Sequence, residues 1–145
     1  MLARYPETIK LVFKNFPLRN HTYAAKAAAA ALAAQAQGKF WPFHKALFDN
    51  ARRLSDDKIR QIAAQLSLDM DKFEADMESQ ATKELIARDV KEGKQAGVRG
   101  TPTIFINGIR LTQRNLRGFQ KVIDAELKNN QQQKSGCSKN SVTED

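Results

Sequence analysis

Cysteine is the residue of this chain with the most direct capacity for redox chemistry, and it occurs once, as Cys137. Thiol–disulfide exchange needs one thiol that attacks and a second that resolves the mixed disulfide. In a Cys-x-x-Cys arrangement both thiols are close together and one is stabilised as a thiolate. Cys137 has no such neighbour, although Lys134 and Lys139 favour its thiolate. The sequence therefore predicts no catalytic role for this thiol.

The two histidines, His21 and His44, are candidates for a general base or a metal ligand. Neither has a second candidate ligand at helical or hairpin spacing, and the sequence holds no Cys/His cluster of metal-binding type. His44 also lies between Phe43 and Leu47 on a predicted helix. We therefore expect structural roles for both histidines, with no metal site and no cofactor.

The N-terminal part of the chain predicts one strand and one helix. Residues 9–16 combine β-branched and aromatic side chains and end at Pro17, which favours a strand. Residues 22–37 are rich in alanine, the residue with the highest helix propensity, and Gly38 provides a natural stop. So many small side chains allow another element to approach this helix closely.

A short aromatic helix is predicted next. Phe40, Phe43 and Leu47 lie at helical spacing, and Pro42 is tolerated in a first turn. Phe40, Phe43 and Trp41 are more often core residues than ligand-binding residues in such a pattern, so a core role is the first interpretation.

Three later helices are predicted from one start signal, in which a residue before the helix packs onto its fourth position while a polar side chain caps the free amides. The capping residues are Ser55, Asp69 and Thr112. The second of these helices is expected to be long and to end at Gly97, and the third to span residues 113–128. The packing pairs are Leu54 with Ile59, Leu68 with Phe73, and Leu111 with Leu116.

Between the last two helices, Asn107 and Gly108 predict a tight turn because both tolerate positive φ angles. Residues 103–111 are therefore expected to form a β-hairpin. After Asn129 almost nothing apolar follows, so residues 130–145 are expected to be a polar, disordered tail. One domain over residues 1–129 is expected.

Charge and hydropathy argue against two classes of partner. Lys and Arg outnumber Asp and Glu by 24 to 16, a net charge of +8, but the two signs interleave along most predicted helices. No recognisable nucleic-acid motif accompanies the charge, so no nucleic-acid partner is expected. No stretch approaches the roughly 18 apolar residues of a membrane span, and no membrane partner is expected. Residues 1–6 also lack the apolar core of a signal peptide.

The run Val-Arg-Gly-Thr-Pro-Thr-Ile-Phe-Ile-Asn-Gly, which begins at Val98, resembles the loop and hairpin after the long helix of DsbA-like thioredoxin-fold proteins. Residues 10–18 resemble the second core strand of that family, residues 24–34 the start of its inserted helical subdomain, and residues 38–41 the opening of the next helix. The resemblance covers about residues 1–128. It implies an α/β, thioredoxin-like fold with a helical insertion over residues 22–97. It also implies the activity of the family, thiol–disulfide oxidoreduction, and the family's usual compartment, the bacterial cell envelope or periplasm.

The resemblance also implies a site. In the family, the proline that matches Pro102 has a cis peptide bond beside the redox cysteines, and the residue before it offers backbone hydrogen bonds to an extended polypeptide. Thr101 and Pro102 are therefore expected to bind substrate, and the bond between them to be cis, although most X-Pro bonds are trans. The helix of Phe40 and Trp41 is near the same face in the family, which keeps a peptide-binding role open.

At the N-terminus the sequence departs from the family. Members have a first strand and then a Cys-x-x-Cys at a helix start, which lowers the thiol pKa. Here Met1-Leu-Ala-Arg-Tyr-Pro looks like the end of that helix, so the fold is expected to be incomplete and no catalytic residue is carried over. The missing strand would lie between residues 9–16 and 103–106. We expect the exposed edges to cause a homodimer or larger oligomer, with direct pairing of these two segments in a monomer as the alternative.

Two functions fit these features. The first is a DsbA-like thiol–disulfide oxidoreductase domain that lacks its Cys-x-x-Cys and is inactive in dithiol exchange as this chain. A truncated sequence, a wrongly chosen start codon or a broken gene would each explain the loss. The second is a non-catalytic thioredoxin-fold module that binds extended polypeptide or a partner protein through Thr101, Pro102 and the aromatic helix. Nucleic-acid binding driven by the charge of +8 ranks last.

Overall fold

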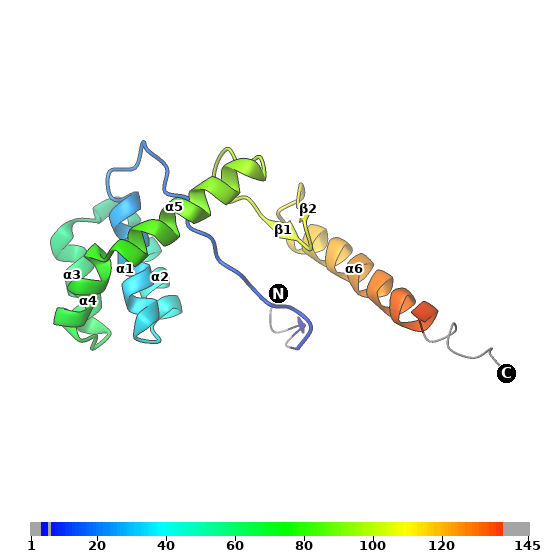
Figure 1. Cartoon of the computed structure of the whole chain (residues 1–145), viewed down its shortest axis with the longest axis horizontal. Helices are drawn as coiled ribbons and strands as arrows, with labels where there is room; N and C mark the ends of the chain where they lie inside the picture. Colours follow the sequence, from blue (N-terminus) through cyan, green and yellow to red (C-terminus); the bar gives the residue numbers. More distant parts are fainter. Residues whose placement is uncertain (1–3, 6, 138–145) are drawn as a thin grey trace. The chain divides into compact units, whose positions relative to one another are not determined.

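The computed structural model describes residues 4, 5 and 7–137. It divides into two compact units: Phe13–Thr101, called the helical unit here, and Met1–Val12 together with Pro102–Asp145, called the hairpin unit. Helices and one small sheet occur together in the described residues, which agrees with the α/β class expected from the sequence. In chain order the elements of the helical unit are α1 (Ala24–Ala36), α2 (Phe40–Asp49), the short 3-10 helix η2 (Ala51–Arg53), α3 (Asp56–Gln65), α4 (Met70–Glu78) and α5 (Gln80–Gln95) (Figure 1).

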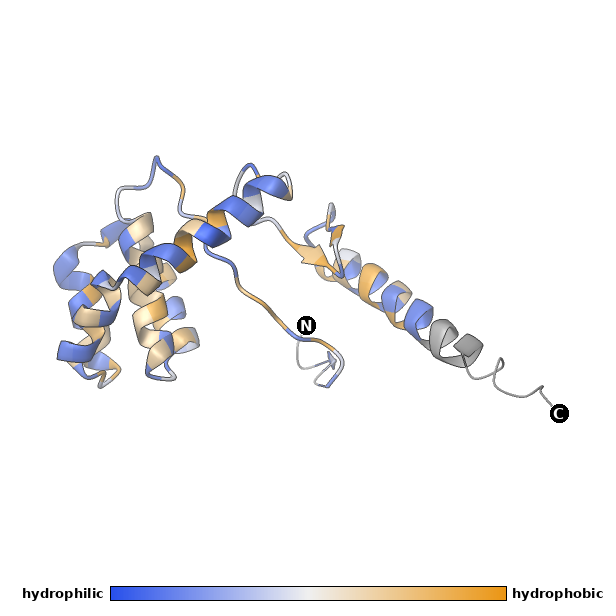
Figure 2. Cartoon of the chain, viewed as in Figure 1, coloured by the Kyte–Doolittle hydropathy of each residue, from blue (hydrophilic) through white to orange (hydrophobic). Residues whose placement is uncertain are grey.

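Helix α1 packs against each of the other α-helices of this unit. Its alanines make this possible, because small side chains let neighbouring backbones approach closely. The apolar character of α1 and α2 is visible in Figure 2. Gly38, with φ of +72°, takes the left-handed conformation that ends a helix, at the place where the sequence predicts a stop. The buried alanines of α1 are Ala30, Ala31, Ala33 and Ala34.

The centre of the core is a pair of phenylalanines. Phe43 of α2 and Phe73 of α4 are fully buried, and their ring centroids are 5.6 Å apart. Ile62 of α3 is also buried in this cluster. Burying such a side chain stabilises a fold by about 1.5–3 kcal/mol relative to leaving it exposed. The inward position of Phe43 fixes which other side chains of α2 remain on the surface.

The caps predicted at Ser55 and Asp69 are present, but the single long helix expected after Asp69 is two helices. Ser79 interrupts it with an extended backbone (ψ of 147°), and its hydroxyl accepts a hydrogen bond from the backbone N–H of Thr82 at 3.1 Å. The same hydroxyl donates to the carbonyl of Asp76 at 2.9 Å. Serine competes in this way with helical hydrogen bonds, so α4 ends and α5 starts at this residue.

The strand predicted over residues 9–16 is not formed; these residues adopt neither helix nor strand. The residue types of the segment favour a strand, but a strand forms only beside a neighbouring strand that completes its backbone hydrogen bonds. In the part of the chain that the structure describes, the sheet contains only β1 (Phe105–Ile106) and β2 (Ile109–Arg110). The alternative pairing of residues 9–16 with residues 103–106 is therefore also not formed.

The hairpin unit contains β1, β2 and helix α6 (Leu116–Cys137). Phe105 pairs with Arg110 and Ile106 with Ile109 in antiparallel register. Asn107 and Gly108 have φ of 47° and 82°, as the tight turn predicted from their types requires. The hairpin thus lies where the sequence predicts it.

Both ends of α6 differ from the expectation. Its cap is Asn115, whose side-chain oxygen accepts a hydrogen bond from the backbone N–H of Gly118 at 2.8 Å, and Thr112 lies in a bend before it. A Cβ on Gly118 would clash with the carbonyl oxygen of Gln113, so the loop folds tightly over the first turn of the helix. The helix continues to Cys137, beyond the predicted start of the tail at residue 130, because extending an existing helix needs no new nucleus. Residues 138–145 of the expected tail lie outside the described residues.

Candidate functional site

A buried carboxylate on α5 holds the segment that precedes α1. Asp89 and Asn15 are 4% and 5% exposed. The backbone N–H of Asn15 donates to Asp89 Oδ2 at 2.9 Å, and Asn15 Nδ2 donates to the same oxygen at 3.1 Å. Lys14 Nζ donates to Asp89 Oδ1 at 3.2 Å. Three donors thus compensate the burial of one charge, which ties this segment to α5.

Lys14 adds a second link from this segment to α5. Its ammonium donates to Glu92 Oε2 at 2.8 Å in addition to Asp89, and these two hydrogen bonds, the one to Glu92 first, raise the pKa of Lys14. The side chain is half exposed, so solvent weakens the pair. The energetically important contact of the segment is therefore the buried one at Asp89.

Phe16 lies against α5 at Gly93. A Cβ at position 93 would stand 2.9 Å from Cδ2 of the Phe16 ring, so only glycine allows this approach without a shift of the ring. From its type alone, Gly93 is a residue that loosens the last turns of the helix; in the structure it makes room for Phe16. The segment from Phe13 to Phe16 is thus fixed by one buried polar contact and one apolar contact.

The fixed segment places Phe13 against α2, where it joins an aromatic cluster. The ring centroid of Phe13 is 5.4 Å from that of Phe40 and 4.8 Å from that of His44. His44 is in turn 4.8 Å from Phe48 and 5.9 Å from Trp41. We call Phe13, Phe40, Trp41, His44 and Phe48 the aromatic cluster.

Much of this cluster faces solvent. Phe48 is 69% exposed, Trp41 51% and Phe13 43%. The core role expected for Trp41 is therefore not observed, whereas Phe43, on the other face of α2, is fully buried. Aromatic side chains that remain exposed together are a common feature of binding surfaces.

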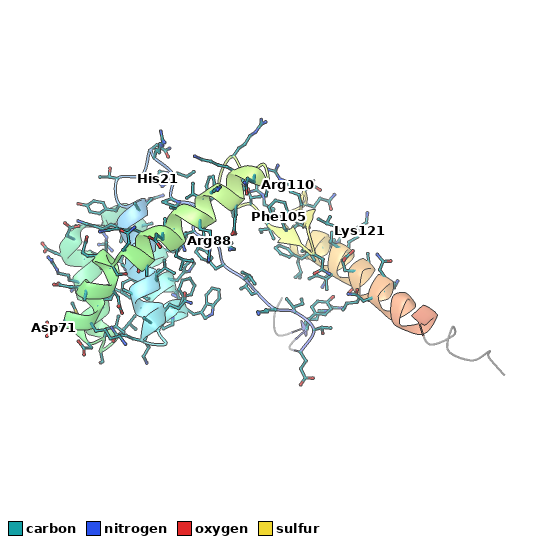
Figure 3. All side chains as sticks on the ribbon, viewed as in Figure 1. His21, Asp71, Arg88, Phe105, Arg110 and Lys121 are labelled. Atoms are coloured by element: carbon teal, nitrogen blue, oxygen red, sulfur yellow. The ribbon has the colours of Figure 1, made fainter. Side chains whose placement is uncertain are left out.

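His44 lies among the rings of the cluster. Its Nε2 is buried and has no hydrogen-bond partner in the described part of the molecule. Burial lowers the pKa of His44 below its usual 6.5, because the charged imidazolium is poorly solvated among the rings. The neutral form is therefore the stable one at pH 7. The other histidine, His21, is exposed in the turn before α1 (Figure 3).

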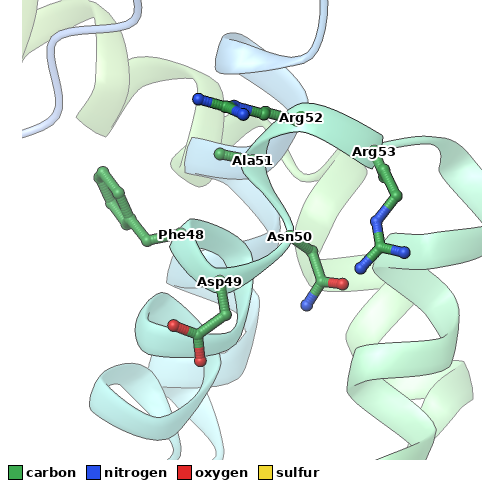
Figure 4. A pocket seen from close by; sticks show the side chains of 6 residues that line it. All are labelled: Phe48, Asp49, Asn50, Ala51, Arg52 and Arg53. Carbon is green, nitrogen blue, oxygen red and sulfur yellow. The ribbon is translucent and has the colours of Figure 1, made fainter.

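A hollow of about 300 Å³ adjoins the cluster at the end of α2. Asp49 in its wall is paired with Lys45 at 2.6 Å. Arg52 and Arg53 have no ion-pair partner among the described residues. Figure 4 shows Arg52 extending to the same side of the turn as Phe48, and Arg53 to the other side, near Asn50. The lining residues are Phe48, Asp49, Asn50, Ala51, Arg52 and Arg53.

Thr101 and Pro102, the residues that the sequence singles out for substrate binding, are exposed and lie in a bend. The division between the two units falls between them. Arg114 Nη1, from the loop before α6, donates to the carbonyl oxygen of Pro102 at 2.9 Å. No sequence pattern predicts a role for this arginine, because the contact joins two loops twelve residues apart.

Cys137 ends α6, and its side chain lies outside the described residues. Within the described ranges, no group of three or more His, Cys, Asp or Glu side chains is arranged to hold a metal ion. None of the described helices combines the length and hydropathy that crossing a bilayer requires.

Comparison with known proteins gives a consistent match. The family model of the DSBA-like thioredoxin domain matches residues 2–125. The probable disulfide bond formation protein D of Bacillus cereus is 27% identical over 128 residues, which cover 83% of this chain and 59% of that protein. The Na(+)/H(+) antiporter NhaA of Herminiimonas arsenicoxydans is 34% identical over 109 residues, and NhaA 3 of Salinispora tropica is 36% identical over 104 residues.

These matches cover only part of each relative. The antiporter matches include 75% and 71% of this chain but 17% and 16% of the two antiporters. The chain thus spans less than a fifth of these relatives, and about three fifths of the disulfide bond formation protein. No solved structure matches the chain.

Proposed function

Since the chain belongs to the DsbA-like thioredoxin-domain family, we propose that it supplies the substrate-facing part of a thiol–disulfide oxidoreductase domain and that this chain catalyses no dithiol exchange. One observation carries the second half of the proposal: the matched residues 2–125 contain no cysteine, and Cys137 lies outside them. A single thiol forms a mixed disulfide but has no intramolecular partner that resolves it.

The substrate-facing role is assigned to Thr101 and Pro102, with a cis bond between them as part of the proposal. Their exposure supports this assignment, because an extended polypeptide must reach the backbone of the loop. The hydrogen bond from Arg114 to the Pro102 carbonyl supports it too, since a loop held in one conformation loses less entropy when it binds.

A reduction assay with insulin and dithiothreitol tests the redox part. We expect the wild-type chain to precipitate insulin no faster than the Cys137→Ser variant, and both to match the reaction without protein. A wild-type rate well above that of Cys137→Ser would refute the proposal, because it would assign turnover to the one thiol. A mixed disulfide with glutathione, detected by mass spectrometry on Cys137 alone, is compatible with it.

A second candidate function is a non-catalytic module that binds extended polypeptide or a partner protein. The specific observation in its favour is the aromatic cluster, in which Phe13, Trp41 and Phe48 are each more than two fifths exposed. Self-association into a homo-oligomer belongs to the same group of proposals. Its support is the exposed apolar segment that residues Leu11 and Val12 form, at 53% and 61% exposure.

A further inference from the structure

We propose that the aromatic cluster and the hollow at Arg52 form one docking site for a polypeptide segment in which an aromatic side chain is followed closely by a carboxylate. The inference rests on the second candidate function, polypeptide binding, and is independent of the redox proposal. It narrows that function, because it assigns binding to the exposed face of α2 and the turn after it, without Thr101 and Pro102.

The apolar half of the site is the exposed face of α2. Phe40, His44 and Phe48 are spaced four residues apart, so they lie on one face of the helix, and Phe13 covers its first turn. The rings already contact one another at angles typical of aromatic pairs, which leaves little side-chain entropy to lose when another ring docks.

The polar half is the hollow. Asp49 is neutralised by Lys45, whereas Arg52 has no anionic partner among the described residues. A guanidinium presents a fork of N–H donors that fits a carboxylate with two parallel hydrogen bonds. The hollow therefore has an excess of positive charge, and an acidic side chain is the polypeptide group that complements it.

Phe48 joins the two halves. It belongs to the aromatic cluster and also lines the hollow, and it is the most exposed of the large apolar side chains described. A ligand that occupies both halves therefore presents its apolar and acidic groups close together, because Phe48 borders both halves. This spacing favours a polypeptide over a compact anion, which would fill the hollow without contacting the rings.

Trp41 provides the readout, because it is the only tryptophan of the chain and lies in the cluster. The full chain is titrated with three synthetic peptides of equal length that contain Phe-Glu, Phe-Lys or Ala-Glu at their centre, and Trp41 emission is recorded. We expect saturable binding of the Phe-Glu peptide. The affinities of the other two peptides are expected to be lower by about tenfold or more. Equal affinity of the Phe-Glu and Phe-Lys peptides would overturn the inference.

The variants compare residues of like chemistry inside and outside the site. Arg52→Ala and Phe48→Ala are each expected to lower the affinity for the Phe-Glu peptide by about tenfold. Arg99→Ala is the matched control for the arginine, because Arg99 is exposed in the loop after α5 and also has no ion-pair partner among the described residues. Phe105→Ala, exposed on β1, is the control for the phenylalanine. Each control is expected to change affinity less than about twofold. Equal losses in Arg52→Ala and Arg99→Ala would overturn the site, because non-specific attraction would then explain the charge effect. Circular dichroism confirms that each variant is folded.

Three further results would also overturn the inference. If Pro102→Ala abolishes peptide binding while Phe48→Ala does not, polypeptide binding stands but the site is the Pro102 loop. If light scattering shows a dimer that Phe48→Ala converts to a monomer of 16.3 kDa, the occupant is a second copy of the chain. If anionic phosphatidylserine vesicles bind through the same residues and the Phe-Glu peptide does not, the occupant is a lipid surface.

Discussion

The two faces of α2 contain similar side chains, but one face is buried in the core and the other is exposed. Phe43 and Leu47 point into the core, where Phe43 meets Phe73. The other face contributes four rings to the aromatic cluster: Phe40, Trp41, His44 and Phe48. Two of these, Trp41 and Phe48, are more than half exposed, and much of Phe13 beside them is exposed too. The difference arises from position on the helix rather than from residue type. One face stabilises the core. The other face leaves apolar side chains exposed to water, where a ligand can contact them.

The comparison is tested most strongly by truncating one phenylalanine on each face. Phe43→Ala removes a fully buried ring and leaves a cavity, so we expect it to lower the free energy of unfolding by about 3–5 kcal/mol. Phe48→Ala, at a side chain 69% exposed, is expected to change it by less than about 0.5 kcal/mol. Urea unfolding followed by circular dichroism measures both. Similar losses for the two variants would mean that the exposed face also contributes to the core.

A smaller effect is expected at the contact that joins Phe13 to the exposed face. Asp89→Ala leaves the buried amides of Asn15 without an acceptor, and we expect a loss of about 3 kcal/mol in the free energy of unfolding. Lys14→Ala removes only the half-exposed partner and should cost less than about 1 kcal/mol. Asp89→Ala should also change the emission of Trp41, because Phe13 is no longer held against the cluster. An unchanged emission would show that the cluster forms without the contact between Asn15 and Asp89.

Local signals made the helices predictable from the sequence. The caps at Ser55 and Asp69 act within three residues, and both form the expected hydrogen bonds to backbone N–H groups. The same logic missed Ser79, because apolar residues continue at helical spacing on both sides of it. It also placed the cap of α6 at Thr112, because the apolar pair around Thr112 fits the start signal, whereas the cap in the structure is Asn115. Competing local signals are decided by the fold of the loop around them.

The strand and the site depended on contacts that are distant in sequence. Residues 9–16 have the composition of a strand, but strand formation requires a partner that composition does not supply. The aromatic residues of α2 were recognisable from their spacing. The packing of Phe13 against α2 was not predictable, because it depends on the contact of Asn15 with Asp89, 74 residues further along the chain. The hollow at Arg52 gave no signal either, as it requires the turn between α2 and α3 to be placed first.

The smallest effect expected concerns His44, which lies on the exposed face yet has a buried Nε2. Burial lowers its pKa in the folded state below 6.5, so between these two values the unfolded chain binds more protons than the folded one. The contribution of His44 to stability is therefore complete above pH 6.5 and is lost as the pH falls through 6.5 toward the lowered value. The surrounding rings attract a cation, which opposes this trend.

Unfolding free energies at pH 7.5 and pH 5.0 measure this dependence. We expect wild type to lose more stability on acidification than His44→Gln, in which this titration is absent. If wild type instead gained stability relative to His44→Gln at pH 5.0, the imidazolium would be favoured by the faces of Phe13, Phe40 and Phe48. His44 would then belong energetically to a cation-binding surface, and the two faces of α2 would differ in charge preference as well as in exposure.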